Sequence, residues 1–255
     1  MALEAAAGGA SLLVAVGGDG TINEVVNGLV LVPGTELAVL PRGTGGDFVR
    51  TFGIPSKIED AARVAVSGRA RTIDAGRAAY RSWQGEEETA HFANIASAGM
   101  SGAVAQRTNE ATSAPLGGKA AYLWSTVAVF VRWRNAEITV TVDGETRSGP
   151  MFDVIVANCR YLGGGMKMVP DAEPDDGLLD VLLIGDVSKL DLVTTMPKIY
   201  RGTHLPHPKA ELLRGAFVTV EAAEPLPVEL DGEQPGTTPV RFEVVPGALR
   251  LRVPA

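Results

Sequence analysis

Four consecutive residues, Gly17-Gly18-Asp19-Gly20, combine a turn that could bind phosphate with a carboxylate. Glycine lets the backbone approach a ligand closely, and free N–H groups at the start of a helix favour a phosphate. Asp19 would repel that phosphate unless a cation lay between them, and Mg²⁺ prefers oxygen ligands of this kind. We therefore predict a nucleotide phosphate site with magnesium at Asp19. The alternative is an ordinary strand-to-helix turn that Asp19 caps.

A second glycine-rich loop, LPRGTGGDFVRTFGIP at residues 40–55, offers similar groups. Thr44 can donate a hydroxyl group to a nucleotide, and Asp47 offers a second carboxylate for a shared metal. Arg42 and Arg50 supply positive charge for phosphate. The alternative is a loop whose glycines serve only for turning and whose arginines lie on a solvated face.

The elements that position these two loops can be predicted from the residues around them. Apolar runs at 12–16 and 36–40 are typical of strands buried on both faces. The segment that starts at Thr21 has apolar residues at helical spacing, and Thr21 with Glu24 forms a capping-box pattern. Both loops should therefore lie at the carboxyl ends of parallel strands, where open α/β sheets bind ligands.

The pattern of apolar and polar residues changes after about residue 73. Alternating apolar and polar residues then dominate, which indicates an antiparallel sheet or sandwich. Helices are expected at 118–132 and 188–202. We predict two domains, an α/β nucleotide-binding domain at 1–73 and a β-sandwich substrate domain at 74–255.

Net charge, cysteine content and the length of apolar segments argue against several classes of protein. The net charge of −7 argues against broad nucleic-acid binding, because no basic excess is present to displace phosphate counterions. The single cysteine, Cys159, cannot form an intrachain disulfide, which fits a reducing compartment. The longest apolar segment, 120–131, falls short of the roughly 20 residues that span a bilayer. We expect a cytoplasmic protein without a transmembrane segment.

The predicted first domain is small. A sheet of two strands buries little surface, and the opening MALEAAAGGAS resembles the end of an amphipathic helix. From the sequence we expect that an upstream strand and helix are absent. The alternative is a first domain that leans on the second.

The two loop motifs together resemble the diacylglycerol kinase catalytic-domain family, bacterial lipid kinases that are related to sphingoid-base kinases. The resemblance continues in order through most of the chain. Its further segments are FANIASAGMSGAVA (92–105), YLGGGMKMVPDAEPDDGLLDVLLI (161–184), LPVELDGEQPG (226–236) and the terminal TPVRFEVVPGALRLRVP.

The family implies a nucleotide held between an α/β domain and a β-sandwich domain, with ATP and Mg²⁺ as cofactors. By this resemblance, Asp19 and Asp47 organise the catalytic magnesium, partly through water, and Glu233 is the general base. The implied contacts to ATP are Gly17, Gly18, Asp19, Gly20, Thr21, Ile22, Asn23 and Thr44.

The resemblance also implies a second, structural magnesium. Asp176 would bind it with its carboxylate, and Glu173 and Leu178 with their backbone carbonyl oxygens. A turn formed by 163–165 could cradle a phosphate, and a plain turn is the alternative. Gly46 departs from the family pattern, because an asparagine is usual at that position.

The resemblance predicts phosphoryl transfer from ATP to a lipid hydroxyl, with diacylglycerol as the default acceptor. NAD kinases share the GGDGT string, so an NAD-kinase-like activity is the alternative, but it leaves the second loop and the terminal DGE unexplained. A non-catalytic nucleotide- or lipid-binding remnant is the third option. The expected partners are a lipid at the inner membrane surface and, as an open option, a second copy of the chain in a homodimer.

Overall fold

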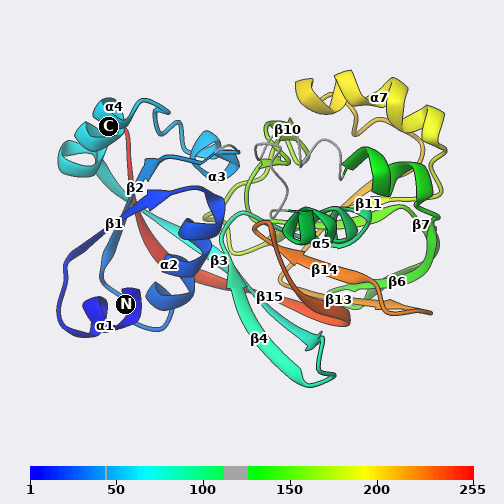
Figure 1. Ribbon diagram of the computed structural model, residues 1–255, viewed down its shortest axis with the longest axis horizontal. Coiled ribbons are helices and arrows are strands. Elements are labelled where there is room, and N and C mark those ends of the chain that lie inside the picture. Colours follow the sequence, from blue (N-terminus) through cyan, green and yellow to red (C-terminus); the bar gives the residue numbers. More distant parts are fainter. Residues whose placement is uncertain (44, 112–125) are drawn as a thin grey trace.

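One 13-stranded sheet runs through the molecule and joins an α/β part to a larger all-β part. The computed structural model describes residues 1–43, 45–111 and 126–255. In Figure 1 the α/β part, mostly blue, lies at the left and the all-β part at the right. This arrangement confirms the predicted fold class, an α/β domain packed on an antiparallel β-sandwich.

The α/β part is built on two parallel strands, β1 (Leu12–Gly17) and β2 (Glu36–Pro41). Gly17 pairs with Pro41, so both strands end at the same edge of the sheet and their loops leave side by side. The helices of this part are α1 (Ala2–Ala7), α2 (Asp19–Leu29), α3 (Asp47–Thr51) and α4 (Ile58–Ser67).

β1 is not buried on both faces, so that expectation from its apolar run is wrong. The side chains of Val14 and Val16 are 45% and 52% exposed, whereas Ala15 between them is buried. Alternate residues of a strand point to opposite faces, so Val14 and Val16 share the open one. Among the described strands β1 pairs only with β2, and the packing partners rather than the apolar run decide its burial.

Two long antiparallel strands tie the parts together, β3 (Arg69–Ser82) and β15 (Glu233–Val253). Near its end, β15 also pairs in parallel with β2, and Leu251 belongs to the core of the α/β part. The boundary expected after residue 73 falls inside continuous β3. The division of the chain into 1–73 and 74–255 stays a prediction.

The remaining elements build the all-β part, and the order of its neighbouring strands is given by their hydrogen bonds. Its strands are β4 (Glu87–Phe92), β5 (Ile95–Gly99), β6 (Ala136–Val142), β7 (Glu145–Met151), β8 (Asp153–Ala157), β9 (Tyr161–Leu162), β10 (Met166–Lys167), β11 (Leu179–Ile184), β12 (Ala210–Gly215), β13 (Phe217–Ala222) and β14 (Pro227–Leu230). Eight of these strands pair with one another and with β15 in the order β12-β11-β8-β5-β14-β15-β13-β6-β7, whereas β4 pairs with β3, and β9 and β10 form a separate two-stranded sheet.

The core of the all-β part lies between the two layers of this curled sheet. Phe92 and Phe242 pack edge to face there, with 5.9 Å between their ring centroids. Its helices are α5 (Met100–Ala111) and α7 (Lys189–Arg201). α7 confirms the helix predicted at 188–202. The helix predicted at 118–132 lies partly outside the described residues, and 126–132 is helical.

Candidate active site

The two glycine-rich loops touch through their backbones. A methyl group built on Gly43 would lie 2.4 Å from the Cα atom of Gly18. The loops after β1 and β2 can approach this closely only because neither position carries a side chain. Thr44, the predicted nucleotide contact in the second loop, lies outside the described residues.

The N-terminus of α2 faces the space beside these loops. α2 begins at Asp19 with Gly18 as its N-cap, and no side chain of the described chain caps it. The predicted capping box of Thr21 and Glu24 is therefore wrong, because the helix starts early enough to place Thr21 inside its first turn. The uncapped N–H groups and the helix dipole can serve a phosphate.

Asp19 ties the first loop to the second. Its Oδ2 atom accepts a hydrogen bond from the Gly46 N–H at 3.0 Å, and its Oδ1 atom accepts one from the Phe48 N–H at 3.3 Å. Gly46 has a φ of 65° and lies in the left-handed region, which glycine and asparagine tolerate best. The family's usual asparagine suits the same backbone, so glycine here preserves the turn and loses only the side-chain amide.

Asp47 is buried and binds a loop of the other part of the molecule. Its two carboxylate oxygens accept hydrogen bonds from the N–H groups of Gly164 and Gly165, both at 2.7 Å. Burial raises the pKa of Asp47, repulsion from Asp19 adds to the rise, and the two N–H donors oppose it. The turn at 163–165 therefore holds a protein carboxylate, although the sequence suggested a phosphate cradle or a plain turn.

The two aspartates border one small space. A methyl group built on Gly45 would lie 2.7 Å from Asp19 Oδ2 and 3.8 Å from Asp47 Oδ2. Each carboxylate oxygen keeps an acceptor site beyond its backbone hydrogen bond. This set of oxygens fits Mg²⁺, which takes few protein ligands and keeps several waters.

Glu233 comes to this site from the opposite end of the chain. It is the first residue of β15, follows the tight turn at Asp231 and Gly232, and is exposed. A methyl group built on Gly20 would lie 3.2 Å from Glu233 Oε1. The carboxylate predicted as the base therefore lies directly beside the loop predicted to hold the nucleotide.

Asp231, two residues before Glu233, has a structural role. Its oxygens accept hydrogen bonds from the N–H groups of Ala93, Asn94 and Ile95 at 2.8–3.0 Å. Burial raises the pKa of Asp231 to about 6, and these hydrogen bonds oppose the rise. Asp231 is 6% exposed, so it anchors the turn that presents Glu233.

Two of the predicted ATP contacts have other partners. The Asn23 amide donates to Asp231 Oδ2 at 3.1 Å and to the carbonyl oxygen of His91 at 3.0 Å. Ile22 is buried in the core of the α/β part, and its N–H donates to the Gly18 carbonyl oxygen. Asn23 therefore fixes α2 to the DGE turn, while Ile22 supports the loop from inside.

Two further buried acids near this turn are absent from the sequence prediction. Glu229 on β14 accepts from the Ser97 hydroxyl at 3.0 Å, and Asp153 on β8 accepts from the Ser101 N–H at 2.9 Å. Burial raises the pKa of Glu229 to about 8 and that of Asp153 to about 7. The signal in the sequence was an acid inside an apolar strand, as in PVEL and MFDVIVAN.

Glu229 should make stability fall as pH rises from its ordinary pKa of 4.5 towards about 8. The folded state keeps its proton up to about pH 8, whereas the unfolded chain releases it near the ordinary value of 4.5. The stability from this group is present at low pH and is lost as pH rises through about 8. Between about pH 7.5 and 8.5 we expect the free energy of unfolding to fall by about 0.7 kcal/mol, which is the last part of a loss of about 1.4 kcal/mol per pH unit at lower pH.

Urea unfolding of the wild type and of Glu229→Gln over this pH range measures the effect. The variant keeps an acceptor for Gly232 and removes the titrating group. His91 and His204 do not interfere, because burial lowers their pKa values and they are largely neutral in both states above about pH 7.5. Equal pH dependence in the two proteins would contradict the assignment.

The predicted structural metal site is a separate turn before β11. The Asp176 carboxylate accepts from the Leu178 N–H at 3.0 Å and from the Arg214 guanidinium. Arg214 also pairs with Asp180 at 3.0 Å, and Glu173 is exposed. Among the residues that the structure describes, no three acidic, histidine or cysteine side chains gather as a metal site. Asp176 with two backbone carbonyl groups stays a prediction.

Comparison with known families matches both parts of the chain. The family described as "Diacylglycerol kinase catalytic domain" matches residues 1–78. The family described as "YegS C-terminal NAD kinase beta sandwich-like domain" matches residues 94–253.

Individual relatives match over nearly the whole chain. A Pseudomonas aeruginosa protein named "Probable lipid kinase YegS-like" is 37% identical over 99% of this chain and 80% of its own length. A "Diacylglycerol kinase" of Staphylococcus carnosus is 29% identical over 91% of this chain and 72% of its own.

Solved structures show the same fold. The crystal structure of a diacylglycerol kinase from Bacillus anthracis has a TM-score of 0.70 and 22% identity, over 98% of this chain and 79% of that one. Yeast NADH kinase, solved with NADH, has a TM-score of 0.54 and 12% identity, over 92% of this chain and 57% of that one.

Proposed function

This chain belongs to the diacylglycerol kinase catalytic-domain family, and we propose that it is a lipid kinase that transfers the γ-phosphoryl group of ATP to the hydroxyl group of diacylglycerol. One observation carries the proposal. Glu233 Oε1 lies 3.2 Å from the position of a methyl group built on Gly20, so a candidate base adjoins a candidate phosphate loop. A phosphoryl donor and an acceptor hydroxyl could meet between them.

Different groups of the protein would bind the phosphates, hold the metal and accept the proton. The glycines of the first loop let the phosphates approach the uncapped N–H groups of α2, and the exposed Arg42 and Arg50 add positive charge. Mg²⁺ held by Asp19 and Asp47 would neutralise charge on the transferring group. Glu233 accepts the proton of the lipid hydroxyl, which is a poor nucleophile until it is deprotonated.

The site of action follows from the acceptor. Among the described helices none is long and apolar enough to cross a membrane. A lipid acceptor stays in its bilayer, so we propose that the protein works as a peripheral enzyme at the inner membrane surface.

Phosphate transfer from ATP tests the function directly. The protein, ATP and magnesium are incubated with micellar diacylglycerol, and phosphatidic acid is the expected product. A sphingoid base and NAD in parallel reactions compare acceptors. Phosphorylation of NAD without phosphorylation of any lipid would overturn the proposal.

The turn at Asp176 should respond to magnesium if it holds a metal. We expect saturating magnesium to stabilise the wild type by about 1–3 kcal/mol relative to chelator, because a ligand that binds only the folded state adds its binding energy to stability. Asp176→Ala should lose this increment. Asp175→Ala is the matched control, because Asp175 pairs with Arg71 at 2.8 Å and that loss is equal in both conditions.

Thermal unfolding with magnesium and with chelator measures both variants. Equal melting temperatures of the wild type in the two conditions would count against a metal at this turn. The Arg214 guanidinium would then be sufficient to balance the charge of the Asp176 carboxylate.

A further inference from the structure

α7 carries apolar side chains on two of its sides. Leu192 and Ile199 are buried against the β-sandwich. The other side is open to solvent, with exposed fractions of 72% for Leu190, 60% for Val193, 38% for Met196 and 53% for Tyr200. Their spacing of three, three and four residues places them along one face of the helix. The inward stripe explains the packing of α7, and the outward stripe needs another explanation.

A neighbouring helical segment, 126–132, extends this outward surface. Val127 and Val131 lie four residues apart on one side of it and are 47% and 58% exposed. Its other side packs inward, with Phe130 in the same cluster as Leu192. The Lys189 ammonium group at the start of α7 donates to the carbonyl oxygen of Val131, so the two helices meet. We call the outward side chains of both helices the α7 face.

The charge around the α7 face is opposite in sign to that of the whole protein. The chain has a net charge of −7, yet α7 contains three bases and one acid. That acid, Asp191, is engaged by Ser188 and by Lys209 at 3.4 Å. The exposed charged side chains at this end of the molecule include the bases Arg132, Arg134, Lys189, Lys198, Arg201 and Lys209 and the acid Asp186.

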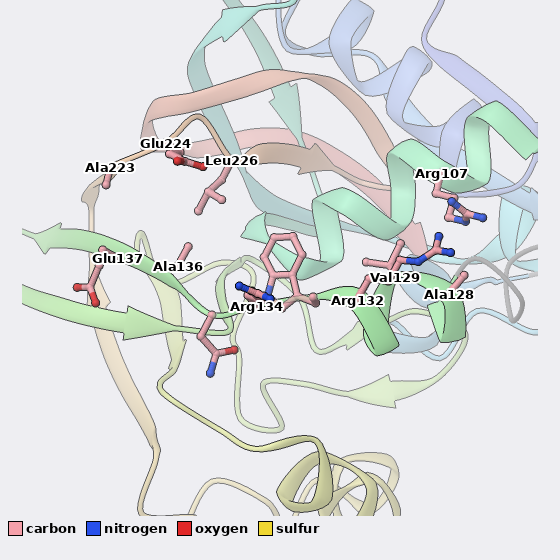
Figure 2. A pocket seen from close by; sticks show the side chains of 12 residues that line it. Arg107, Ala128, Val129, Arg132, Arg134, Ala136, Glu137, Ala223, Glu224 and Leu226 are labelled. Atoms are coloured by element: carbon pink, nitrogen blue, oxygen red, sulfur yellow. The ribbon is translucent and has the colours of Figure 1, made fainter.

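A hollow beside the segment 126–132 adds to the positive charge. It has a volume of about 620 Å³, and it is lined by three arginines, Arg107 on α5, Arg132 and Arg134, against two glutamates, Glu137 and Glu224. Figure 2 shows these arginine side chains along the hollow, with the apolar Val129 and Leu226 among its other lining residues. Arginines beside apolar side chains suit a surface where anionic headgroups meet acyl chains.

We propose that the α7 face is the surface with which the protein docks on an anionic lipid bilayer. The inference rests on the proposed lipid kinase function and names the part of the molecule that meets the membrane. The apolar side chains would enter the boundary between headgroups and acyl chains, and the surrounding bases would pair with anionic headgroups.

The position of α7 connects such a docked bilayer to the candidate active site. α7 packs against β10, and a methyl group built on Gly202 at its end would lie 2.9 Å from the Lys167 side chain. The turn between β9 and β10 donates the two hydrogen bonds to Asp47. In Figure 1 α7, in yellow, lies beside β10 at the upper edge of the molecule. One turn therefore separates the docking surface from a carboxylate of the site.

Vesicle binding without nucleotide or diacylglycerol tests the docking alone. The variant Leu190→Glu/Val193→Glu changes two exposed positions of the α7 face. Its matched control is Leu31→Glu/Val66→Glu, which adds the same charge at positions 61% and 82% exposed in the α/β part. Cosedimentation uses vesicles of phosphatidylcholine alone and of phosphatidylcholine with phosphatidylglycerol. Phosphorylation of a short-chain, monomeric diacylglycerol is measured in parallel.

We expect the wild type and the control to bind the anionic vesicles and the α7 variant to bind them at least about tenfold more weakly. Retained phosphorylation of the monomeric lipid by the α7 variant would support docking and the proposed function together. If binding depends on the α7 face but the protein phosphorylates no lipid, the docking proposal would be supported and only the proposed lipid kinase function would be overturned. Equal binding by both variants, or a dimer that the α7 variant alone dissociates, would overturn the docking proposal.

Discussion

Replacement of Glu233 by glutamine is expected to lower turnover on diacylglycerol by roughly 10²–10⁴-fold, while the affinity for ATP stays nearly unchanged. Glutamine keeps the size of the side chain and removes its ability to accept a proton. Glu233 is exposed beside Gly20, so its loss disturbs no core contact. Positioning and charge neutralisation supply most of the remaining catalysis in phosphoryl transfer, so a residual rate should persist. Steady-state kinetics and calorimetry with ATP measure the two quantities separately.

Two control variants locate the effect. Glu243→Gln makes the same chemical change on the same strand, at an exposed residue that pairs with Arg77 at 3.5 Å, and should leave turnover intact. Asp231→Asn places an amide among backbone N–H donors and should lower the melting temperature, because its oxygens accept from three backbone groups. Full turnover of Glu233→Gln, together with an inactive but stable Asp231→Asn, would move the role of base to Asp231.

Gly20→Val is expected to weaken ATP binding by about 100-fold or more, which removes about 3 kcal/mol of binding energy. The valine side chain would occupy the space between α2 and Glu233 Oε1, where the first methyl group already comes within 3.2 Å. It would also keep phosphates away from the N–H groups of the first helical turn. Calorimetric titration with ATP measures the loss.

The fold of this variant needs an independent check. Gly185→Val is a matched control, because a methyl group there meets nothing closer than 3.4 Å and the position lies outside the candidate active site. Both variants should keep most of the wild-type melting temperature. Unchanged ATP affinity of a folded Gly20→Val protein would show that the loop after β1 does not hold the phosphates.

The sequence by itself determined the features that depend on neighbouring residues. The strand-turn-helix unit around Gly18, the helix α7 and the alternating strands of the all-β part are all readable from local spacing, and the structure contains them. The pairing of two glycine-rich loops was also predictable, because consecutive parallel strands bring their carboxyl ends to one edge. Glu233 could be singled out only through the resemblance of its DGE segment to a family.

Tertiary structure decided the features that depend on residues far apart in the chain. Asp231 binds the backbone at 93–95 because β14 pairs with β5, and Asp47 binds the turn at 163–165 because α3 packs against β9. The same long-range packing leaves Val14 exposed although its strand is apolar throughout. Local sequence sets which conformations a segment favours, whereas burial and hydrogen-bond partners follow from the strand neighbours that the complete fold supplies.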